Sequence, residues 1–238
     1  MNGDMEWETE YFEELASTND YLKGRRAERR NLIASARRQS GGRGTKGRSF
    51  SSETGGVYVS VLTFYQDFSA KNAFQIMANA AVAVAKTLET FGLAPVIKWA
   101  NDIFVNGKKI CGILIENTFS GAFVDNAVVG VGVNVCNRLP AELDEIATTM
   151  ENELGVRVDV DEVRDILVAK LKEKHGMDEY LRRIGYMGKR ATLILGEQAQ
   201  EVTLLSVDNE GGLNVVTERS ERLRFVAGEI SVKVEGKE

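Results

Sequence analysis

The sequence has little of what several common kinds of protein chemistry require. Among its 238 residues are two cysteines, two prolines and one histidine, His175. A single histidine nearly excludes serine–histidine catalysis and metal sites rich in histidine. Cys111 and Cys136 each lie in an apolar run without metal-ligand spacing, so we expect small buried thiols in a reducing cytosol.

Long hydrophobic runs are also lacking. No apolar stretch reaches the ~20 residues that a membrane helix needs. The first ten residues, MNGDMEWETE, have neither the basic start nor the apolar core of a signal peptide. Since 43% of the residues are hydrophobic and 27% are charged, the composition is that of a globular protein. We therefore expect a cytoplasmic protein without a membrane partner.

Charge is unevenly distributed in the first part of the chain. Residues 1–22 carry seven acidic residues and no lysine or arginine, whereas residues 23–48 carry ten basic residues and one acidic residue. The whole chain has a formal net charge of −5. The local positive excess predicts an anionic ligand or a phosphate-bearing partner. A solvated helix face is the favoured interpretation for four of the basic residues, Arg25, Arg26, Arg29 and Arg30. It fits Arg43, Lys46 and Arg48 poorly, because these three lie among glycines.

Hydrophobic periodicity predicts an α+β fold with a mixed sheet and flanking helices, which we expect on one side of the sheet, because helices and strands do not alternate strictly. Strands are predicted at residues 31–37, 57–64, 95–99, 103–105, 109–116 and 123–135. Helices are predicted to start at 17–20, to span 70–91 after a cap at Ser69, and to fill much of 139–187. Asn106-Gly107 is a strong hairpin signal between two of the strands.

The C-terminal fifth of the chain has a different pattern. Five short strand-like runs, at 191–195, 200–207, 212–217, 221–226 and 229–234, are separated by glycine, asparagine and aspartate. Closely spaced short strands of this kind predict a small β-barrel. We therefore expect two domains, at residues 1–187 and 188–238.

A glycine-rich loop follows the first predicted strand. Residues 42–47 read Gly-Arg-Gly-Thr-Lys-Gly and are followed by Arg48. The loop leads into a strand rather than a helix, which excludes a dinucleotide-binding turn, and it lacks the Gly-Lys-Ser/Thr of a P-loop. The loop carries the cationic side chains of Arg43, Lys46 and Arg48, and its backbone has exposed N–H groups. Such a loop could wrap around a phosphate and close over it as a lid. An ordinary surface loop is the alternative, although long structureless loops are uncommon unless functional.

Two further segments carry polar groups at predicted strand ends. Asn101 and Asp102 end one strand, and the hairpin should bring Lys109 beside them, where it could neutralise a carboxylate and a phosphate together. A solvated hairpin lysine is the alternative, and Lys108 fits that description. Gly130, Gly132 and Asn134 share one strand face by the period of two. The glycines would leave a flat floor for a ring, or would instead admit a neighbouring helix.

Taken together, these segments resemble the biotin–protein ligases over nearly the whole chain. The matching motifs are Ser17-Thr18-Asn19, Gln39 before Gly42-Arg43-Gly44, Lys98-Trp99-Ala100-Asn101-Asp102, Lys109 with Gly112-Ile113-Leu114-Ile115-Glu116, and Gly130-Val131-Gly132-Val133-Asn134. The resemblance implies a catalytic fold related to class II aminoacyl-tRNA synthetases and a C-terminal SH3-like barrel. It is to the short form of the family, because no DNA-binding helix-turn-helix fits ahead of Ser17, and we expect no DNA partner.

The resemblance implies the activity of a biotin–[acetyl-CoA-carboxylase] ligase. Such an enzyme activates biotin with ATP and Mg²⁺ to biotinyl-5′-AMP. It then passes the biotinyl group to a lysine of a biotin carboxyl carrier protein, in acetyl-CoA carboxylase or a related carboxylase. Acyl adenylation needs positioning and charge stabilisation but no protein nucleophile, which suits this chain. The oligomeric state stays open, with a homodimer as one alternative.

Site residues follow from the resemblance position by position. The implied biotin-binding residues are Ser17, Thr18, Asn19, Gln39, Arg43, Gly44, Thr45 and Lys109. The implied ATP-binding residues are Arg48, Asn101, Lys109, Gly130, Gly132 and Asn134. The implied catalytic residues are Lys109, Arg43, Arg48 and Asp102, and no residue is expected to be a dedicated metal ligand. Asp102 would orient the acceptor lysine or help to place Mg²⁺, and the sequence leaves both roles open.

Three positions depart from the family, which often has arginine at Thr45, proline at Ala100 and tryptophan at Phe50. These departures concern closure of the glycine loop rather than the chemistry. Two rival interpretations remain. A lipoate–protein ligase would share the fold and the adenylate, but Ser17, Thr18 and Gln39 favour a bicyclic urea over an apolar dithiolane. A nucleic-acid-binding module would need aromatic residues among the basic ones, and residues 23–48 contain none.

Overall fold

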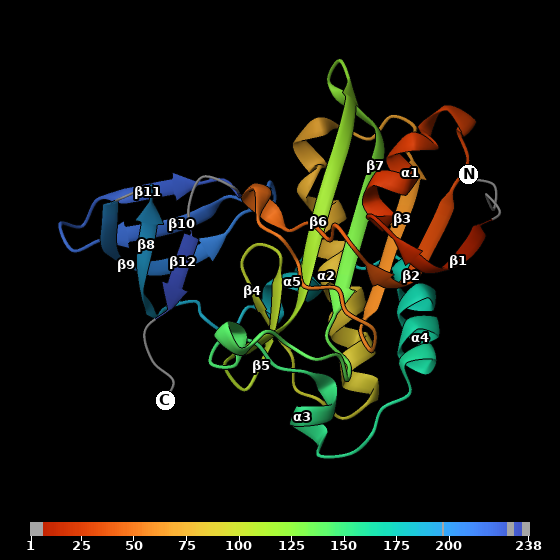
Figure 1. The fold of residues 1–238 in the computed structure, drawn as a ribbon. Helices are drawn as coiled ribbons and strands as arrows, with labels where there is room; N and C mark the ends of the chain where they lie inside the picture. The colour runs from red at the N-terminus through yellow and green to blue at the C-terminus, as the bar shows by residue number, and fades with distance from the viewer. Residues whose placement is uncertain (1–6, 197, 228–230, 235–238) are drawn as a thin grey trace.

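The computed structural model describes residues 7–196, 198–227 and 231–234, and its strands form two sheets (Figure 1). The seven-stranded sheet has the order β1-β2-β3-β7-β6-β5-β4. Its strands are β1 (Glu8–Leu15), β2 (Leu32–Gln39), β3 (Val57–Phe64), β4 (Val96–Lys98), β5 (Asp102–Val105), β6 (Lys108–Ser120) and β7 (Phe123–Val133). Because β1 pairs with β2 in parallel and the other neighbours are antiparallel, the predicted mixed sheet is confirmed.

Strand β1 is absent from the strands that the sequence predicts. It lies at an edge of the sheet, and its sequence, ETEYFEEL, is half glutamate. No residue of β1 is fully buried. An edge strand with charged side chains gives a weak hydrophobic pattern, so the periodicity that identified β2 and β3 could not identify β1.

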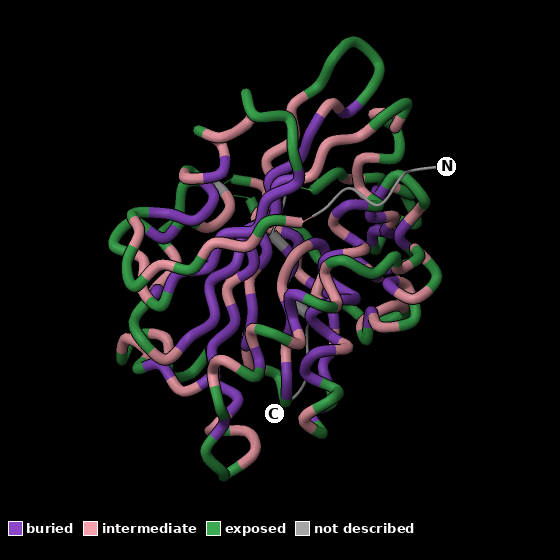
Figure 2. Tube along the Cα trace, turned by 90° about the vertical axis from the view of Figure 1, so that its right-hand side faces the viewer, coloured by how far each residue is buried: buried purple, intermediate pink, exposed green. Residues whose placement is uncertain are grey.

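The helices cover both faces of this sheet, which corrects the expectation of helices on one side only. Helix α1 (Thr18–Gly24) packs on one face, where Leu22 joins Leu32, Leu62 and Val128 in a small apolar cluster. The opposite face carries the main core, which includes α2 (Phe74–Thr90) and α4 (Val160–Lys172), with α5 (Met177–Arg182) against α2. The short helix α3 (Met150–Leu154) follows β7. Buried segments run through the centre of the molecule and exposed segments lie at the turns (Figure 2).

Most predicted element boundaries agree with the structure, with one helix start as the main correction. Helix α2 begins at Phe74, not at residue 70. Ser69 does cap a turn, since its hydroxyl accepts from the Lys71 N–H, but that turn is a 3₁₀ helix at Ala70–Asn72. The predicted hairpin is confirmed, because Asn106 and Gly107 both have positive φ, at 48° and 82°, as a two-residue turn between β5 and β6 requires.

The C-terminal strands form a five-stranded antiparallel sheet in the order β11-β10-β9-β8-β12. The strands are β8 (Arg190–Leu195), β9 (Gln198–Val207), β10 (Leu213–Thr217), β11 (Arg222–Phe225) and β12 (Ser231–Val234). Of the strand predicted at 229–234, positions 229 and 230 lie outside the described residues. Among the described residues, no ladder joins β11 to β12, so closure into a barrel, and with it the domain boundary after residue 187, stays a prediction.

The two cysteines are free. Cys111 is buried, as expected, and Cys136 is half-buried. Burial raises the pKa of both thiols, which makes them poor nucleophiles at neutral pH. Within the described part of the chain, no helix is both long and apolar enough to cross a membrane.

The uneven charge of the N-terminal segment is largely neutralised within the chain itself. The ion pairs are Arg25 with Glu10 and Glu28, Arg29 with Asp125, Arg30 with Glu8 and Glu28, Arg37 with Glu13 and Asp161, and Arg38 with Glu14 and Glu53. Several of these carboxylates belong to the acidic strand β1, which pairs with the basic strand β2. The expectation of an external anionic partner is therefore corrected for Arg37 and Arg38. Arg25, Arg29 and Arg30, for which a solvated face is the favoured interpretation, are likewise paired within the chain.

Candidate active site

Most of the predicted site residues lie on the face of the sheet that carries α1. The strand register forms one row of neighbours across four strands. In order, the row contains Tyr58 of β3, Gly132 of β7, Gly112 of β6 and Asp102 of β5. Side chains directly opposite one another on neighbouring strands share a face. This row therefore brings the glycines and Asp102 onto one surface, although they are distant in the sequence.

The N-terminus of α1 forms one end of this surface. Ser17 is the N-cap, and its hydroxyl accepts from the Asp20 N–H at 3.3 Å, as the sequence predicts. The next two residues, Thr18 and Asn19, are buried. Thr18 donates to Gln39 Oε1 through both its N–H, at 2.8 Å, and its hydroxyl, at 3.0 Å. The predicted residues Ser17, Thr18, Asn19 and Gln39 are thus brought together.

Two serines that the sequence analysis did not select complete this hydrogen-bond network. Ser52 Oγ accepts from Gln39 Nε2 at 3.0 Å. Ser60, which is fully buried, lies 2.7 Å from Thr18 Oγ1 and donates to Asn19 Oδ1 at 2.6 Å. The signal for Ser60 is a lone hydroxyl inside the otherwise apolar strand VYVSVLTF. Its importance depends on α1 packing over β3, which no local pattern encodes.

Protein groups cover the predicted glycine floor. A Cβ at Gly130 would clash with the Asn19 amide, and a Cβ at Gly132 would clash with the Phe50 ring. Phe50 also lies over Gly112, where a Cβ would be 3.2 Å from the ring. Both glycines of β7 are therefore needed for close approach of a flat group, and in this structure those flat groups are an amide and a phenyl ring.

Arg43 of the glycine loop reaches across to Glu116 of β6. Its Nη2 donates to Glu116 Oε2 at 2.9 Å and to Asp20 Oδ1 at 2.7 Å. Glu116 also accepts from Lys23 at 2.9 Å and from Asn19 at 3.0 Å. Burial alone would raise the pKa of Glu116, but the hydrogen bonds from these cationic and amide groups outweigh burial and hold its pKa below the ordinary value. Glu116, which had no predicted role, thus joins α1 to the loop.

The rest of the loop is more open. Gly44 N–H donates to Arg48 O at 2.7 Å, and a 3₁₀ turn spans Thr45–Gly47. Arg48 is exposed, and its guanidinium contacts Thr45 at 3.4 Å, at both the carbonyl and the hydroxyl oxygen. Among the described residues it has no carboxylate partner. Arg48 is therefore a cation of the predicted site that is not neutralised within the described chain.

Lys109 and Asp102 are brought together as the hairpin predicts. Their Nζ and Oδ1 atoms are 2.7 Å apart, and both side chains are partly exposed. Asn101 Nδ2 donates to Ile113 O at 3.0 Å and to Asp102 Oδ1 at 3.2 Å. Lys108 points elsewhere and donates to Asp144 O at 2.6 Å. The paired lysine is therefore Lys109, and Lys108 is the peripheral one.

Asn134 directly follows β7 and is buried. Its side-chain oxygen accepts from Asn137 Nδ2 at 3.2 Å, and Asn137 Oδ1 accepts from the Val135 N–H at 3.1 Å. These hydrogen bonds orient the side-chain oxygen of Asn134 toward Asn137. Asn137 is a supporting residue that the sequence analysis missed, because a single asparagine three positions on has no distinctive spacing.

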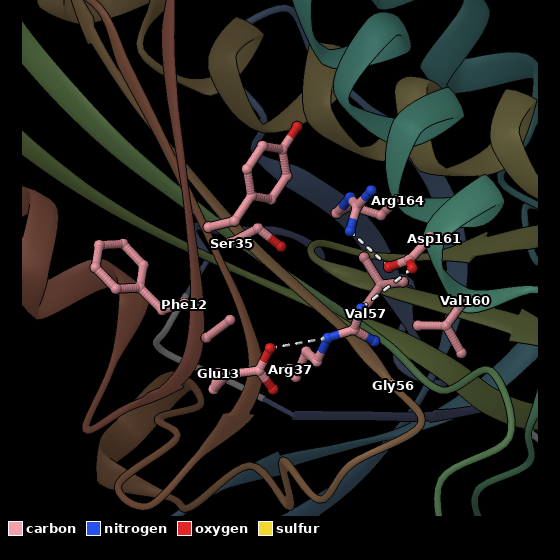
Figure 3. A pocket seen from close by; sticks show the side chains of 11 residues that line it. Phe12, Glu13, Ser35, Arg37, Gly56, Val57, Val160, Asp161 and Arg164 are labelled. Carbon is pink, nitrogen blue, oxygen red and sulfur yellow. Dashed lines mark hydrogen bonds and ion pairs between the residues drawn. The ribbon is translucent and has the colours of Figure 1, made fainter.

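A pocket on the sheet lies apart from this surface. It has a volume of about 180 Å³ and is lined by β1, β2, the start of β3 and the first turn of α4. Ser35, Arg37, Asp161 and Arg164 lie around it, with ion pairs from both arginines to Asp161 (Figure 3). Ser35 pairs in register with Val59 of the main core, so this pocket opens on the opposite face of the sheet.

Comparisons with known proteins identify the family. A model described as the Biotin/lipoate A/B protein ligase family matches residues 11–134. The bifunctional ligase/repressor BirA of Bacillus subtilis is 37% identical over 129 residues, which are 52% of this chain and 39% of that protein. The biotin–[acetyl-CoA-carboxylase] ligase of Paracoccus denitrificans is 35% identical over 142 residues, with 56% of this chain and 58% of that protein covered.

A similar fold is found in the biotin protein ligase of Aquifex aeolicus in complex with biotin and ATP. The two structures have a TM-score of 0.76 and 27% sequence identity, and the match covers 96% of this chain and 99% of the other. The chain thus spans about two fifths of its Bacillus relative but nearly all of the Aquifex structure. The family model covers the strands and the α1 face that carry the predicted site. The chain therefore belongs to the Biotin/lipoate A/B protein ligase family.

Proposed function

We propose that this protein is a biotin–protein ligase, which makes biotinyl-5′-AMP from biotin and ATP and transfers the biotinyl group to a lysine of a biotin carboxyl carrier protein. One observation carries the proposal: a buried network of neutral hydrogen-bonding groups lies on the same sheet face as a set of cations. The neutral network suits a ureido ring, and the cations suit a carboxylate and phosphates. The named activities of the Paracoccus and Aquifex proteins support the same conclusion.

The neutral end would bind the bicyclic head of biotin. Thr18, Asn19 and Gln39 present hydroxyl and amide groups, which can donate to the ureido oxygen and accept from its N–H groups. Ser17 caps α1 and so holds these groups in place. An apolar dithiolane offers none of these hydrogen bonds. Lipoate would therefore gain no hydrogen bond here, and each polar group that it strips of water without replacing the bond would cost roughly 1–3 kcal/mol.

The charged end would stabilise the adenylation step. A carboxylate oxygen of biotin attacks the α-phosphorus of ATP, the bond from that phosphorus to the bridging oxygen breaks, and pyrophosphate leaves. Lys109 and Arg43 would neutralise the carboxylate and the acyl phosphate, while Arg48 would meet the departing phosphates. Gly44 and Thr45 would contribute the loop backbone and one hydroxyl near the acyl phosphate.

The nucleotide would lie toward β5, β6 and the end of β7. Asn101 and Asn134 would face it. Gly132 would let a flat group approach once Phe50 moves aside, and Gly130 would do so where the Asn19 amide now lies. In the second step the acceptor lysine amine attacks the acyl carbon, loses a proton, and AMP leaves. Asp102 would orient that amine or help to place the metal ion.

Mg²⁺ would accompany ATP. Among the described residues no group of three carboxylate, thiolate or imidazole side chains gathers around one point. The donor set near Lys109 is a single carboxylate, Asp102. That set fits an ion held mainly by phosphate oxygens and water. A cytoplasmic location for this reaction is part of the proposal, and the two free thiols fit a reducing compartment.

Biotin-dependent exchange of labelled pyrophosphate into ATP tests the proposal. We expect exchange that requires both biotin and Mg²⁺, followed by labelling of one lysine when a biotin carboxyl carrier domain is added. The matched control is the same carrier domain with its acceptor lysine changed to arginine. Absence of exchange with biotin, at protein concentrations where the chain is folded, would contradict the proposal.

A further inference from the structure

The turn at residues 99–101, which joins β4 to β5, is held from two directions besides its pairing with β6. The Tyr180 hydroxyl donates to Ala100 O at 2.9 Å. The Trp99 indole N–H donates to Gly211 O at 3.0 Å. The first bond comes from α5 and the second from the C-terminal sheet, so two parts of the chain far away in sequence fix one turn.

Tyr180 is built into the core. Its side chain is fully buried, and its ring meets the Phe74 ring edge-on, with centroids 5.4 Å apart. Among the described residues its hydroxyl has one hydrogen-bond partner, Ala100 O. A buried hydroxyl with a single acceptor has little freedom to bond elsewhere. The position of α5 is thereby coupled to the carbonyl of Ala100.

The second anchor is equally rigid. Asp208 organises the turn before β10 by accepting from the Gly212 N–H at 2.9 Å and from Arg224 at 2.6 Å. Gly211 has φ of 84°, and a Cβ there would clash with the Phe74 ring. The Gly211 carbonyl that receives the Trp99 N–H is therefore held by both an ion pair and close packing.

We propose that Tyr180 and Trp99 are positioning residues that fix the 99–101 turn and thereby hold Asn101 and Asp102 beside Lys109. The inference rests on the proposed function and adds to it two residues that touch no substrate. Strand β4 has three residues and lies at the sheet edge, so its ladder alone holds the turn weakly. Ala100 also lacks the fixed φ that a proline would supply, and the two side-chain bonds supply restraint in its place.

Two variants test the proposal with minimal change of shape. Tyr180→Phe removes one oxygen, and Trp99→Phe keeps an aromatic ring but removes the N–H. Tyr186→Phe is the matched control, because Tyr186 packs against the core and its hydroxyl has no hydrogen bond within the described residues. If Tyr180→Phe does not fold, Trp99→Phe still tests the same turn.

The measurements separate the two ends of the site. For Tyr180→Phe and Trp99→Phe we expect kcat/KM for ATP, from pyrophosphate exchange, to fall about 10- to 100-fold, since a displacement of ~1 Å can cost ~100-fold in rate. Biotin affinity without ATP, measured by calorimetry, should stay within about twofold, because the biotin end lies on other strands and distant sites act independently. A loss confined to ATP kinetics would support a positioning role over a merely structural one.

Two results would overturn the inference. One is unchanged ATP kinetics in both variants, and the other is an equal loss of ATP and biotin binding, which would indicate general destabilisation. Failure of the wild-type protein to exchange pyrophosphate would instead contradict the proposed function. In that case hydrogen exchange at the Ile113 N–H, which donates to Asn101 O at 3.0 Å, still tests the turn. Faster exchange in Tyr180→Phe than in Tyr186→Phe supports the restraint, and equal exchange overturns it.

Discussion

The two ends of the candidate site are built in different ways. At the α1 end, Thr18, Asn19 and Ser60 are all buried and are joined by short hydrogen bonds between neutral groups. At the hairpin end, Lys109 and Asp102 are partly exposed and form an ion pair of 2.7 Å. One end is preorganised before any ligand arrives, and the other keeps its cation in a pair that a ligand can rearrange.

This difference matches the chemistry proposed for each end. A neutral ring is recognised by groups whose positions are fixed, because every unpaired polar atom in a buried site is costly. Phosphates carry their own charge and bring Mg²⁺, so a partly solvated lysine or arginine can exchange one anionic partner for another. Glu116 lies at the border, since it bonds both the neutral Asn19 and the cationic Arg43.

Removing the central cation of the charged end should have the largest effect. We expect Lys109→Ala to lower the rate of biotin-dependent pyrophosphate release by about 100- to 1000-fold, because such an electrostatic contact is typically worth ~2.7–4 kcal/mol in the transition state. Lys108→Ala is the matched control, since Lys108 bonds Asp144 O rather than Asp102. Near-normal release from folded Lys109→Ala would remove this residue from the mechanism.

The loop residue that departs from the family should have the next largest effect. Thr45 offers one neutral hydroxyl, whereas an arginine could add charge-assisted hydrogen bonds worth ~1.5–3 kcal/mol each. We expect Thr45→Arg to release preformed biotinyl-5′-AMP roughly 10- to 100-fold more slowly in stopped-flow experiments, since ~1.4 kcal/mol is tenfold. Unchanged release in Thr45→Arg, together with faster release in Lys46→Ala, would assign the role to Lys46.

Loss of one bond at the neutral end should weaken biotin binding without affecting nucleotide chemistry. Ser60→Ala removes the donor to Asn19 Oδ1. We expect the Kd for biotin, measured by calorimetry, to rise about tenfold, which corresponds to ~1.4 kcal/mol. The rate of pyrophosphate release at saturating biotin should change little. Equal biotin affinity in Ser60→Ala and wild type would contradict the preorganised network.

Glu116, which lies at the border between the two ends of the site, should make the stability of the protein depend slightly on pH. The pKa of Glu116 is lower in the folded protein than in the unfolded chain, so its stabilising contribution is present above the unfolded pKa and is lost as pH falls through the folded pKa. We expect Glu116→Gln to lose less Tm than wild type between about pH 5 and pH 3. The difference should be small, because ~1 kcal/mol already shifts Tm by ~2–4 °C in a chain of this size and the Glu116 side chain is partly exposed to solvent. Parallel curves for the two proteins would contradict this account of Glu116.

Local sequence signals predicted much of this arrangement. Ser17 as a cap, Asn106-Gly107 as a turn and Lys109 beside Asp102 all depend on residues within a few positions of one another. Ser60, Glu116 and Tyr180 were missed because their importance depends on which strand or helix packs beside them. The partners of Ser60 and Glu116 lie 41 and 97 residues away, and no periodicity records such a pairing.

A competition between biotin and lipoate for activation by ATP is the most direct test of the central claim, which is that the neutral end of the site selects the substrate. The protein is incubated with ATP, Mg²⁺ and equal concentrations of biotin and lipoate, and the adenylates are identified by mass spectrometry. The buried network of Thr18, Gln39 and Ser60 predicts biotinyl-5′-AMP as the main product. Lipoyl-5′-AMP as the main product, or equal amounts of the two adenylates, would contradict the account.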